Sequence, residues 1–198
     1  MDDNTREHHE ADYTTTKPPW DIDRPQTAFA DLAADGLITG RVLDVGCGTG
    51  EHALLAAGLG LDAVGVDRSQ RAVELAGIKA RARGRTAKFQ QGDALELTAL
   101  GETFDTVLDC GLFHTLAPAD RPTYAAQLAA VLHPGGRYFM LGFSDQQPGD
   151  WGPHRLSRTD IEHTFATGWR IDALTPATLD VLLDPPVIQA WLLSATRI

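Results

Sequence analysis

The chain has little cysteine, little positive charge and no long apolar segment. Two cysteines in 198 residues are too few for a disulfide framework. Seventeen basic residues against 27 acidic ones give a formal net charge of −10, which argues against a nucleic-acid partner, since phosphate binding needs a basic face. No apolar run approaches the roughly 18 residues of a membrane helix, and no basic start with an apolar core indicates a secretory signal. We therefore expect a reduced, cytoplasmic protein without nucleic-acid or membrane partners, as a monomer or a weak homodimer.

One glycine-rich stretch gives the first indication of a binding site. A strand-like apolar run at 42–45 leads into Gly46-Cys47-Gly48-Thr49-Gly50. The apolar run suits a buried parallel strand, and the three glycines would let the backbone turn sharply and lie close to a ligand. The helical run that follows would offer this ligand unpaired backbone N–H groups. Taken alone, the pattern is compatible with any nucleotide-binding turn.

Two acidic residues after later strand-like runs make the pattern more specific. Asp67 ends the second apolar run and lies 21 positions after Gly46. An acid at this place can accept hydrogen bonds from both ribose hydroxyls of a nucleoside. Asp93 follows a third strand-like run at 87–90 and is placed to meet an adenine edge. Together these features indicate a cofactor that contains adenosine.

With these features the chain resembles the class I S-adenosylmethionine-dependent methyltransferases. The resemblance covers roughly Arg41 to Phe143, in which five blocks follow the family's order: 42–50, Asp67, 92–94, 104–109 and 132–136. The segment from Pro18 to Gln26 resembles the lid of the thiopurine and halide/thiol methyltransferase group, which closes over the active site. The loop at 149–155 resembles the segment that lines the acceptor pocket of the same group.

The chain departs from related patterns in two ways. Asp109-Cys110-Gly111-Leu112 stands where enzymes that methylate exocyclic amines of nucleobases or protein amides carry an Asn-Pro-Pro-aromatic run. This difference argues against such acceptors. The chain is also somewhat shorter than many thiopurine-like enzymes, which leaves the size of the acceptor open.

Alternating strand and helix patterns predict a parallel sheet with helices on both faces. The resemblance implies an α/β fold, a doubly wound Rossmann-like seven-stranded sheet in the order 3-2-1-4-5-7-6 with the last strand antiparallel. We expect helices at 26–37, 51–59, 70–80, 120–132 and 158–165, and strands at 42–45, 63–66, 87–90, 103–109, 137–143, 169–174 and 188–196. Ser69 is the expected cap of the third helix, and Ser157 with Asp160 forms an expected capping box.

The polar N-terminus separates from the rest of the chain in composition. We expect a flexible tail at 1–17 and a single methyltransferase domain at 18–198. This domain would comprise an N-terminal lid and helix at 18–40, a cofactor-binding core at 41–143, and an acceptor loop with closing strands at 144–198.

Ligands of such sheets bind beyond the carboxyl ends of the strands, where the strand order reverses. The resemblance places S-adenosylmethionine there, with S-adenosylhomocysteine as the product and no metal. Asp44 would organise the turn and the methionine amine. The residues expected to bind the cofactor are Trp20, Asp44, Gly46, Cys47, Gly48, Gly50, Asp67, Arg68, Gly92, Asp93, Ala94, Asp109, Cys110 and Gly111.

Methyl transfer from a sulfonium mainly requires that the nucleophile is held against the methyl carbon without water. A base is unnecessary for an anionic acceptor but helps a neutral hydroxyl or ring nitrogen. His114 is the candidate catalytic residue, either as a base or by orienting the acceptor. The alternative is a histidine that packs on the cofactor or bonds to the backbone.

Aromatic and cationic side chains suggest an acceptor site. Trp20, Phe113 and Trp151 would supply flat apolar walls for a ring. His154 and Arg155 lie on the loop after the fifth strand, and Arg155 could hold an anionic oxygen of the acceptor. We therefore expect methylation of an aromatic or heterocyclic hydroxyl, thiol or ring nitrogen in detoxification or secondary metabolism.

Two other functions were weighed. A nicotinamide oxidoreductase needs glycines in the pattern G-x-G-x-x-G, whereas Gly50 here is followed by Glu51, so the spacing argues against it. A non-catalytic domain that only binds S-adenosylmethionine, as a sensor or partner, is equally compatible with Asp67 and Asp93. The shaped loop at 145–155 and the tryptophan lid favour an enzyme.

Overall fold

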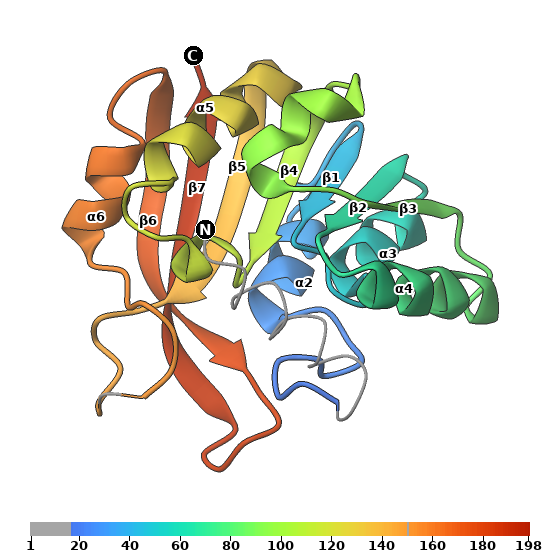
Figure 1. Cartoon of the computed structure of the whole chain (residues 1–198), viewed down its shortest axis with the longest axis horizontal. Coiled ribbons are helices and arrows are strands. Elements are labelled where there is room, and N and C mark those ends of the chain that lie inside the picture. Colours follow the sequence, from blue (N-terminus) through green and yellow to red (C-terminus); the bar gives the residue numbers. More distant parts are fainter. Residues whose placement is uncertain (1–16, 150) are drawn as a thin grey trace.

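The computed structural model describes residues 17–149 and 151–198, and these form one mixed sheet with helices around it (Figure 1). The sheet order is β3-β2-β1-β4-β5-β7-β6, in which β1 to β5 pair in parallel and β7 pairs antiparallel with both neighbours. The predicted order is confirmed. The strands are β1 (Val42–Val45), β2 (Ala63–Asp67), β3 (Ala87–Gln91), β4 (Phe104–Cys110), β5 (Leu132–Phe143), β6 (Trp169–Asp180) and β7 (Val187–Arg197).

The helices follow the predicted positions closely. They are α2 (Thr27–Ala34), α3 (Glu51–Gly58), α4 (Gln70–Ala82), α5 (Arg121–Val131) and α6 (Arg158–Thr164), with short 3-10 helices η1 (Ala94–Leu100) and η2 (Phe113–Thr115). The Ser69 hydroxyl accepts from the Ala72 N–H and so caps α4. Ser157 and Asp160 form the predicted capping box of α6.

Alternation along the strands divides the core into two layers, one on each face of the sheet. Leu43 and Val107 face the layer that contains α5, α6 and η1. Val42 and Leu108, their neighbours in sequence, face the layer that contains α2 and α3. Successive strand residues point to opposite faces, so both faces are buried and helices cover both, as predicted for a doubly wound sheet.

The β6–β7 hairpin differs most from the prediction. β6 runs to Asp180, whereas the apolar pattern indicated a strand that ends at Leu174. Pro176 lies inside β6, and β6 is the edge strand of the sheet, where a residue without an N–H is tolerated. After Leu174, Leu179 is the buried position of β6 and the others are exposed or half-buried, which explains the weaker apolar signal of this part. The added length carries the hairpin past the end of the sheet (Figure 1).

Three segments extend beyond the same edge of the sheet, at the carboxyl ends of the parallel strands. They are the segment at 17–26, the loop at 144–157 and the tip of the β6–β7 hairpin, all in the lower part of Figure 1. The Leu182 N–H donates to the Pro19 carbonyl at 2.7 Å, which joins the hairpin tip to the N-terminal segment. The predicted tail at 1–17 falls outside the described residues, apart from Lys17.

No helix in residues 17–149 and 151–198 has the length and apolar character needed to cross a membrane.

Candidate active site

The loops after β1, β2 and β4 meet at the carboxyl edge of the sheet. Gly46 and Cys47 donate their N–H groups to the Val66 carbonyl at 2.8 and 3.0 Å, which fixes the glycine turn against β2. A Cβ on Gly46 would lie 2.9 Å from Cβ of Leu112, in the segment that follows β4. The structure therefore brings together the glycine turn, the end of β2 and the residues after β4, as a cofactor site at the strand-order reversal requires.

Two glycines of the turn are required by their backbone and by their surroundings. Gly46 has φ +67° and Gly50 has φ +88°, both in the left-handed region. A Cβ on Gly50 would stand 2.6 Å from the ring of Phe89 on β3. Gly50 thus lets α3 begin close against β3, which is a packing reason for glycine that the sequence pattern did not reveal.

Asp67 and Asp93 lie at the edge as predicted, and each also shapes a local turn. Asp67 accepts from the N–H groups of Gly48 at 2.8 Å and Ser69 at 2.9 Å. Asp93 accepts from the Leu95 N–H at 2.9 Å and so caps η1. Both carboxylates therefore fix the backbone of the loops at this edge, at the ends of β2 and β3.

The other residues predicted to bind the cofactor lie close to these two acids or are buried nearby. Arg68 lies 3.6 Å from Asp93, in an ion pair. Gly92 donates its N–H to the Asp67 carbonyl at 2.9 Å. Cys47 and Ala94 are buried, and Cys110 is half-buried at the end of β4.

Asp44, inside β1, is a buried carboxylate with one oxygen unsatisfied. Its Oδ2 accepts from the Ala53 N–H at 2.9 Å, whereas Oδ1 has no hydrogen-bond partner among the described residues. Burial raises the pKa of Asp44 to about 7. A buried acceptor without a donor is costly, and a cationic donor would relieve this cost. These observations fit the ammonium group of S-adenosylmethionine.

Asp109 has a different role from the one predicted. Its side chain is 0% exposed and accepts four hydrogen bonds. Oδ1 takes the N–H groups of Leu112 and Phe113 at 3.0 and 3.2 Å, and Oδ2 takes the hydroxyls of Tyr124 and Tyr138 at 2.7 and 2.8 Å. All of its acceptor positions are used. The carboxylate therefore joins β4, β5 and α5 to the start of η2, rather than binding the cofactor.

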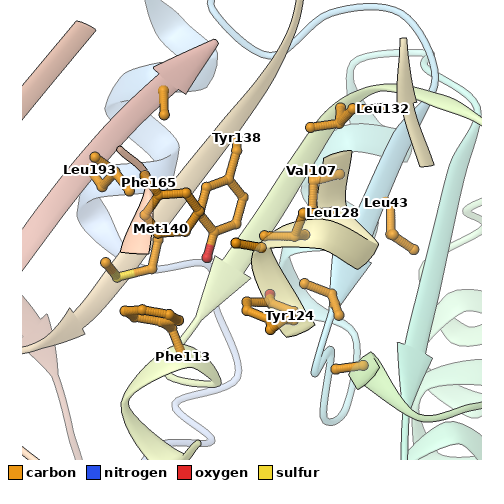
Figure 2. Close-up of a cluster of buried hydrophobic side chains, with 14 of the residues drawn as sticks. Leu43, Val107, Phe113, Tyr124, Leu128, Leu132, Tyr138, Met140, Phe165 and Leu193 are labelled. Atoms are coloured by element: carbon orange, nitrogen blue, oxygen red, sulfur yellow. The ribbon is translucent and has the colours of Figure 1, made fainter. Parts of the chain in front are cut away.

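Phe113 was predicted as a wall of the acceptor site, and this prediction is wrong. Its ring is 0% exposed and lies in the core between Tyr124 and Phe165 (Figure 2), with centroid distances of 6.1 and 5.6 Å. The N–H bond to Asp109 turns Phe113 inward. The sequence placed this residue after β4 but did not reveal which face its ring would take.

His114, the next residue, is buried at the edge of the site. Its Nδ1 accepts from the Phe143 N–H on β5 at 3.0 Å. Burial, and secondarily His154 on the loop after β5, lowers the pKa of His114 to about 4. The imidazole is 8% exposed. The backbone bond weighed in the sequence analysis is therefore present.

Arg155 holds the loop after β5 together through hydrogen bonds to the backbone of that loop. The guanidinium donates to the carbonyls of Gln147, Pro148 and Trp151 and lies over the Phe143 ring at 5.4 Å. This use of the guanidinium does not support the predicted role in holding an acceptor. Trp151 packs edge-on against Phe143 at 5.6 Å and is 45% exposed, as is Trp20. His154 is exposed on the same loop.

The sequence analysis missed a charged cluster that ties the N-terminal segment to the glycine turn. Lys79 on α4 donates to Thr49, Glu51 and Asp21 at 2.7, 2.9 and 3.2 Å. The Thr49 hydroxyl donates to Asp21 at 2.9 Å, and Arg83 binds both oxygens of Glu51 at 2.6 and 2.9 Å. Lys79 and Arg83 stand four residues apart on one helix face, which was the available signal.

Comparisons with known proteins agree on the type of chemistry. A family model described as a methyltransferase domain matches residues 42–136. A 2-heptyl-1-hydroxyquinolin-4(1H)-one methyltransferase from Mycobacteroides abscessus is 32% identical in an alignment 189 residues long that covers 90% of this chain and 83% of that protein. A probable thiol methyltransferase from Arabidopsis thaliana is 29% identical and covers 82% of this chain and 73% of its own length.

A solved structure from work on the conversion of a disulfide bond into a thioacetal group during echinomycin biosynthesis is also similar to this chain. It has a TM-score of 0.87 and 36% sequence identity. The alignment covers 97% of this chain and 92% of that chain, and so includes the lid segment and the loop after β5.

Proposed function

This chain belongs to the class I S-adenosylmethionine-dependent methyltransferases, and from that membership we propose that it methylates a small aromatic or heterocyclic molecule at an oxygen, a sulfur or a ring nitrogen. S-adenosylmethionine is the methyl donor and S-adenosylhomocysteine the product. When bound, the cofactor supplies an electrophilic methyl group on a sulfonium. The task of the chain is to hold the acceptor in line with that group and exclude water.

The observation that carries this proposal is the likeness to the hydroxyquinolinone methyltransferase of Mycobacteroides abscessus. That likeness spans 90% of the chain and therefore reaches beyond the cofactor-binding core into the parts that would meet an acceptor. The name of this relative supports a heterocyclic acceptor, and the name of the plant relative supports a thiol.

Three acids at the sheet edge are proposed to bind the cofactor. Asp44 would accept from the methionine ammonium, which its unsatisfied Oδ1 supports. Asp67 would accept from the ribose hydroxyls, which its place at the end of β2 beside the glycine turn supports. Asp93 would meet the adenine edge. The glycine turn would lie under the methionine part of the cofactor, where its backbone approaches closely.

The proposed acceptor site lies between the lid segment and the loop after β5. Trp20 and Trp151 are both 45% exposed, and their flat faces suit an aromatic ring. His114 follows β4, and His154 on the loop after β5 is near enough to affect its pKa, so both histidines belong to the proposed site. The acceptor site excludes Phe113, because its ring is buried in the core, and Arg155, because its guanidinium donates to carbonyls of its own loop.

The proposal is tested by titration calorimetry followed by a product assay. S-adenosylmethionine and S-adenosylhomocysteine are titrated first, and release of S-adenosylhomocysteine is then measured with phenols, hydroxyquinolinones, thiols and halides. We expect cofactor binding and release with hydroxyquinolinones or aromatic thiols, with a methylated product seen by mass spectrometry. Cofactor binding without release on any of these acceptors would contradict the proposed acceptor class.

A further inference from the structure

The hydrogen bond to His114 fixes where this side chain carries its proton. A neutral imidazole has one nitrogen with a lone pair and one N–H. Nδ1 accepts from the Phe143 N–H at 3.0 Å, so Nδ1 provides the lone pair. The proton of the neutral ring must therefore sit on Nε2.

The surroundings of the ring favour this neutral form. Burial, and secondarily the neighbouring His154, disfavours a second proton and lowers the pKa of His114 to about 4. Against η2, β5 contributes the Phe143 N–H, the end of β4 contributes Asp109, and α5 contributes Tyr124 and Arg121, which contact the neighbouring Phe113 ring. The Asp109 carboxylate is saturated by four donors and accepts nothing from the imidazole. At neutral pH the ring is a donor through Nε2.

The Nε2 edge lies close to Gly111, directly after the carboxyl end of β4. Gly111 has φ +80°, and a Cβ there would lie 3.4 Å from Cε1 and 3.9 Å from Nε2 of His114. The adjoining Leu112 contacts Gly46 of the glycine turn. Within residues 17–149 and 151–198, no group accepts a hydrogen bond from Nε2. This N–H is therefore left for a ligand at the carboxyl end of β4, in the segment whose Leu112 adjoins Gly46.

We infer that His114 donates a hydrogen bond to the acceptor and does not deprotonate it, and that this enzyme methylates acceptors that are already anionic when they react. The matching class is an acidic O–H or S–H compound, which presents a phenolate, an N-oxide anion of a hydroxylated heterocycle, or a thiolate. The inference rests on the proposed function and names the ionisation state of its acceptor.

The reaction balances without a proton transfer to the protein. A lone pair of the anion forms the bond to the methyl carbon, while the bond from this carbon to the sulfonium sulfur breaks and its electron pair goes to sulfur. The anion and the sulfonium both become neutral. The Nε2–H group would hold the nucleophile in line, and its charge-assisted bond would orient the anion.

The first test varies the acceptor and leaves the enzyme unchanged. The kcat/KM of each acceptor is measured from about pH 5 to 9 with S-adenosylmethionine saturating at every pH, so that titration of Asp44 in the free enzyme does not enter. Phenols, N-hydroxy heterocycles and thiols of graded acidity are compared. We expect the rise of kcat/KM with pH to break at the pKa of each acceptor and to move with it. A break at one pH for all acceptors would identify a base on the enzyme and overturn the inference.

The second test compares His114→Gln with His114→Leu. Both variants lose the Nδ1 lone pair, but the amide oxygen of Gln can still accept from the buried Phe143 N–H, whereas Leu cannot. Urea denaturation of each variant therefore accompanies the kinetics and separates a loss of stability from a loss of the donor. Gln keeps an N–H donor at a similar reach, whereas Leu has none. We expect kcat/KM for the acceptor to fall about 10- to 100-fold further in His114→Leu than in His114→Gln, since hydrogen bonds to charged groups contribute that much. Equal losses in both would contradict a donor role.

His154 is the alternative base, because it is exposed on the neighbouring loop and belongs to the proposed acceptor site. His154→Gln can change the size of kcat/KM, but we expect the break in the pH profile to stay at the pKa of each acceptor. A profile that loses its acidic limb would assign the base to His154 and overturn the inference. If the His114 variants fail to bind S-adenosylmethionine, the pH dependence of kcat/KM across the acceptors on the unchanged enzyme decides whether the enzyme supplies a base. Absence of product with every acceptor at every pH would instead contradict the proposed function.

Discussion

Two buried carboxylates on neighbouring strands differ in how many donors reach them. Asp109 accepts four hydrogen bonds, whereas Asp44 accepts one from Ala53 and keeps Oδ1 unsatisfied. Both are nearly or fully inaccessible, so exposure does not distinguish them. The count of donors does. A saturated carboxylate stabilises the fold around it, and an unsatisfied one is suited to a ligand cation.

The pKa of Asp44 makes cofactor affinity depend on pH. Burial raises this pKa to about 7, so the carboxyl of the free enzyme is protonated below that pH. The ammonium group prefers the carboxylate, and binding below pH 7 must therefore release a proton. We expect the Kd of S-adenosylmethionine to weaken by up to about tenfold per pH unit as the pH falls below 7. Calorimetry in two buffers of different ionisation enthalpy measures both the Kd and the released proton.

Asp44→Asn and Asp62→Asn are the variants for this prediction. Asp44→Asn should weaken binding about 10- to 100-fold at neutral pH and remove most of its pH dependence. Asp62 precedes β2 at the opposite edge of the sheet and pairs with Arg41, so its variant should bind normally. A Kd of the unchanged enzyme that stays flat across this pH range would contradict the role of Asp44.

The hydroxyl of Tyr138 tests the structural role of Asp109. Tyr138→Phe removes one of two donors to Oδ2 and leaves the cofactor edge untouched. We expect the free energy of unfolding to fall by about 1–3 kcal/mol, because a buried charged acceptor loses a partner. The Kd of S-adenosylmethionine should stay within about twofold. Urea denaturation and calorimetry measure the two quantities.

Tyr124→Phe is the matched variant, since Tyr124 donates to the same oxygen. The double variant should lose more stability than the sum of the two single losses, because Oδ2 then keeps no hydroxyl donor. Weakened cofactor binding with unchanged stability would instead favour the original prediction that Asp109 binds the cofactor.

At this scale the sequence predicted which residues reach the sheet edge but not how their side chains are used. Asp44, Asp67 and Asp93 were identified by their places in or after strands, and all three lie at that edge. Asp109 and Phe113 were misassigned, because their direction depends on hydrogen bonds from α5 and β5, far along the chain. Hydroxyl donors such as Tyr124 carry no local pattern that reveals a buried partner.

At the scale of elements, one lysine on α4 joins the N-terminal segment to the glycine turn. Lys79 on α4 reaches Asp21 in that segment and Thr49 in the glycine turn, and its side chain is 20% exposed. Desolvation opposes the charge of Lys79, yet its acidic partners prevail and raise its pKa above the ordinary value. The same cation therefore contacts the N-terminal segment and the glycine turn.

Lys79→Met should weaken the attachment of the N-terminal segment and leave the packing of the hydrophobic core unchanged. We expect dissociation of S-adenosylmethionine to become about 3- to 30-fold faster, because partly buried ion pairs that lose one partner leave the remaining charges unsatisfied. Proteolysis within 17–26 should become faster as well. Stopped-flow chase and limited proteolysis measure these rates.

The control for Lys79 is Lys88→Met, which changes an exposed lysine on β3. It removes the same charge from the chain but no contact with the N-terminal segment. Equal dissociation rates in both variants would show that Asp21 is held without Lys79.

Local signals predicted most elements, and their failures have a physical reason. The caps at Ser69 and Ser157 are formed by neighbours three residues away, so the sequence alone was sufficient. The extension of β6 to Asp180 depends on pairing with β7, which is a distant partner. The short helices η1 and η2 begin where Asp93 and Asp109 accept backbone N–H groups, and such turns have no apolar period.

At the scale of the whole molecule, two buried histidines control stability in acid. Burial lowers the pKa of both His52 and His114 to about 4, and His52 uses Nε2 to accept the Gln26 N–H at 3.2 Å. Between pH 6.5 and 4 the unfolded chain binds protons at these positions and the folded chain does not. Their contribution to stability is therefore lost as the pH falls through this range.

Asp44 acts in the opposite direction, because its raised pKa makes the folded free enzyme bind a proton between about pH 4 and 7. The destabilising effect of the two histidines exceeds the stabilising effect of one carboxyl, so the free energy of unfolding decreases as the pH falls. We expect Tm of the free enzyme to fall as the pH is lowered from 6.5 to about 5, and to fall more steeply in Asp44→Asn. Calorimetric melts measure this, and a Tm that rises toward acid would contradict the assignment.

The arrangement of the whole sheet was predictable because five sequence blocks mark the ends of successive strands. The order β3-β2-β1-β4-β5-β7-β6 follows from the family that these blocks indicate. The acceptor was not predictable to the same degree. It depends on the lid segment, the loop after β5 and the hairpin tip, whose shapes are set by contacts such as that of Leu182 with Pro19.

The most direct test of the account is methyl transfer to a hydroxyquinolinone, followed by mass spectrometry and release of S-adenosylhomocysteine. The enzyme is mixed with S-adenosylmethionine and the acceptor above the pKa of the acceptor, and the product is compared with a reaction that lacks enzyme. The account predicts one methyl group on the acceptor oxygen and one equivalent of S-adenosylhomocysteine. Tight cofactor binding with neither product, for this acceptor and for aromatic thiols, would contradict it.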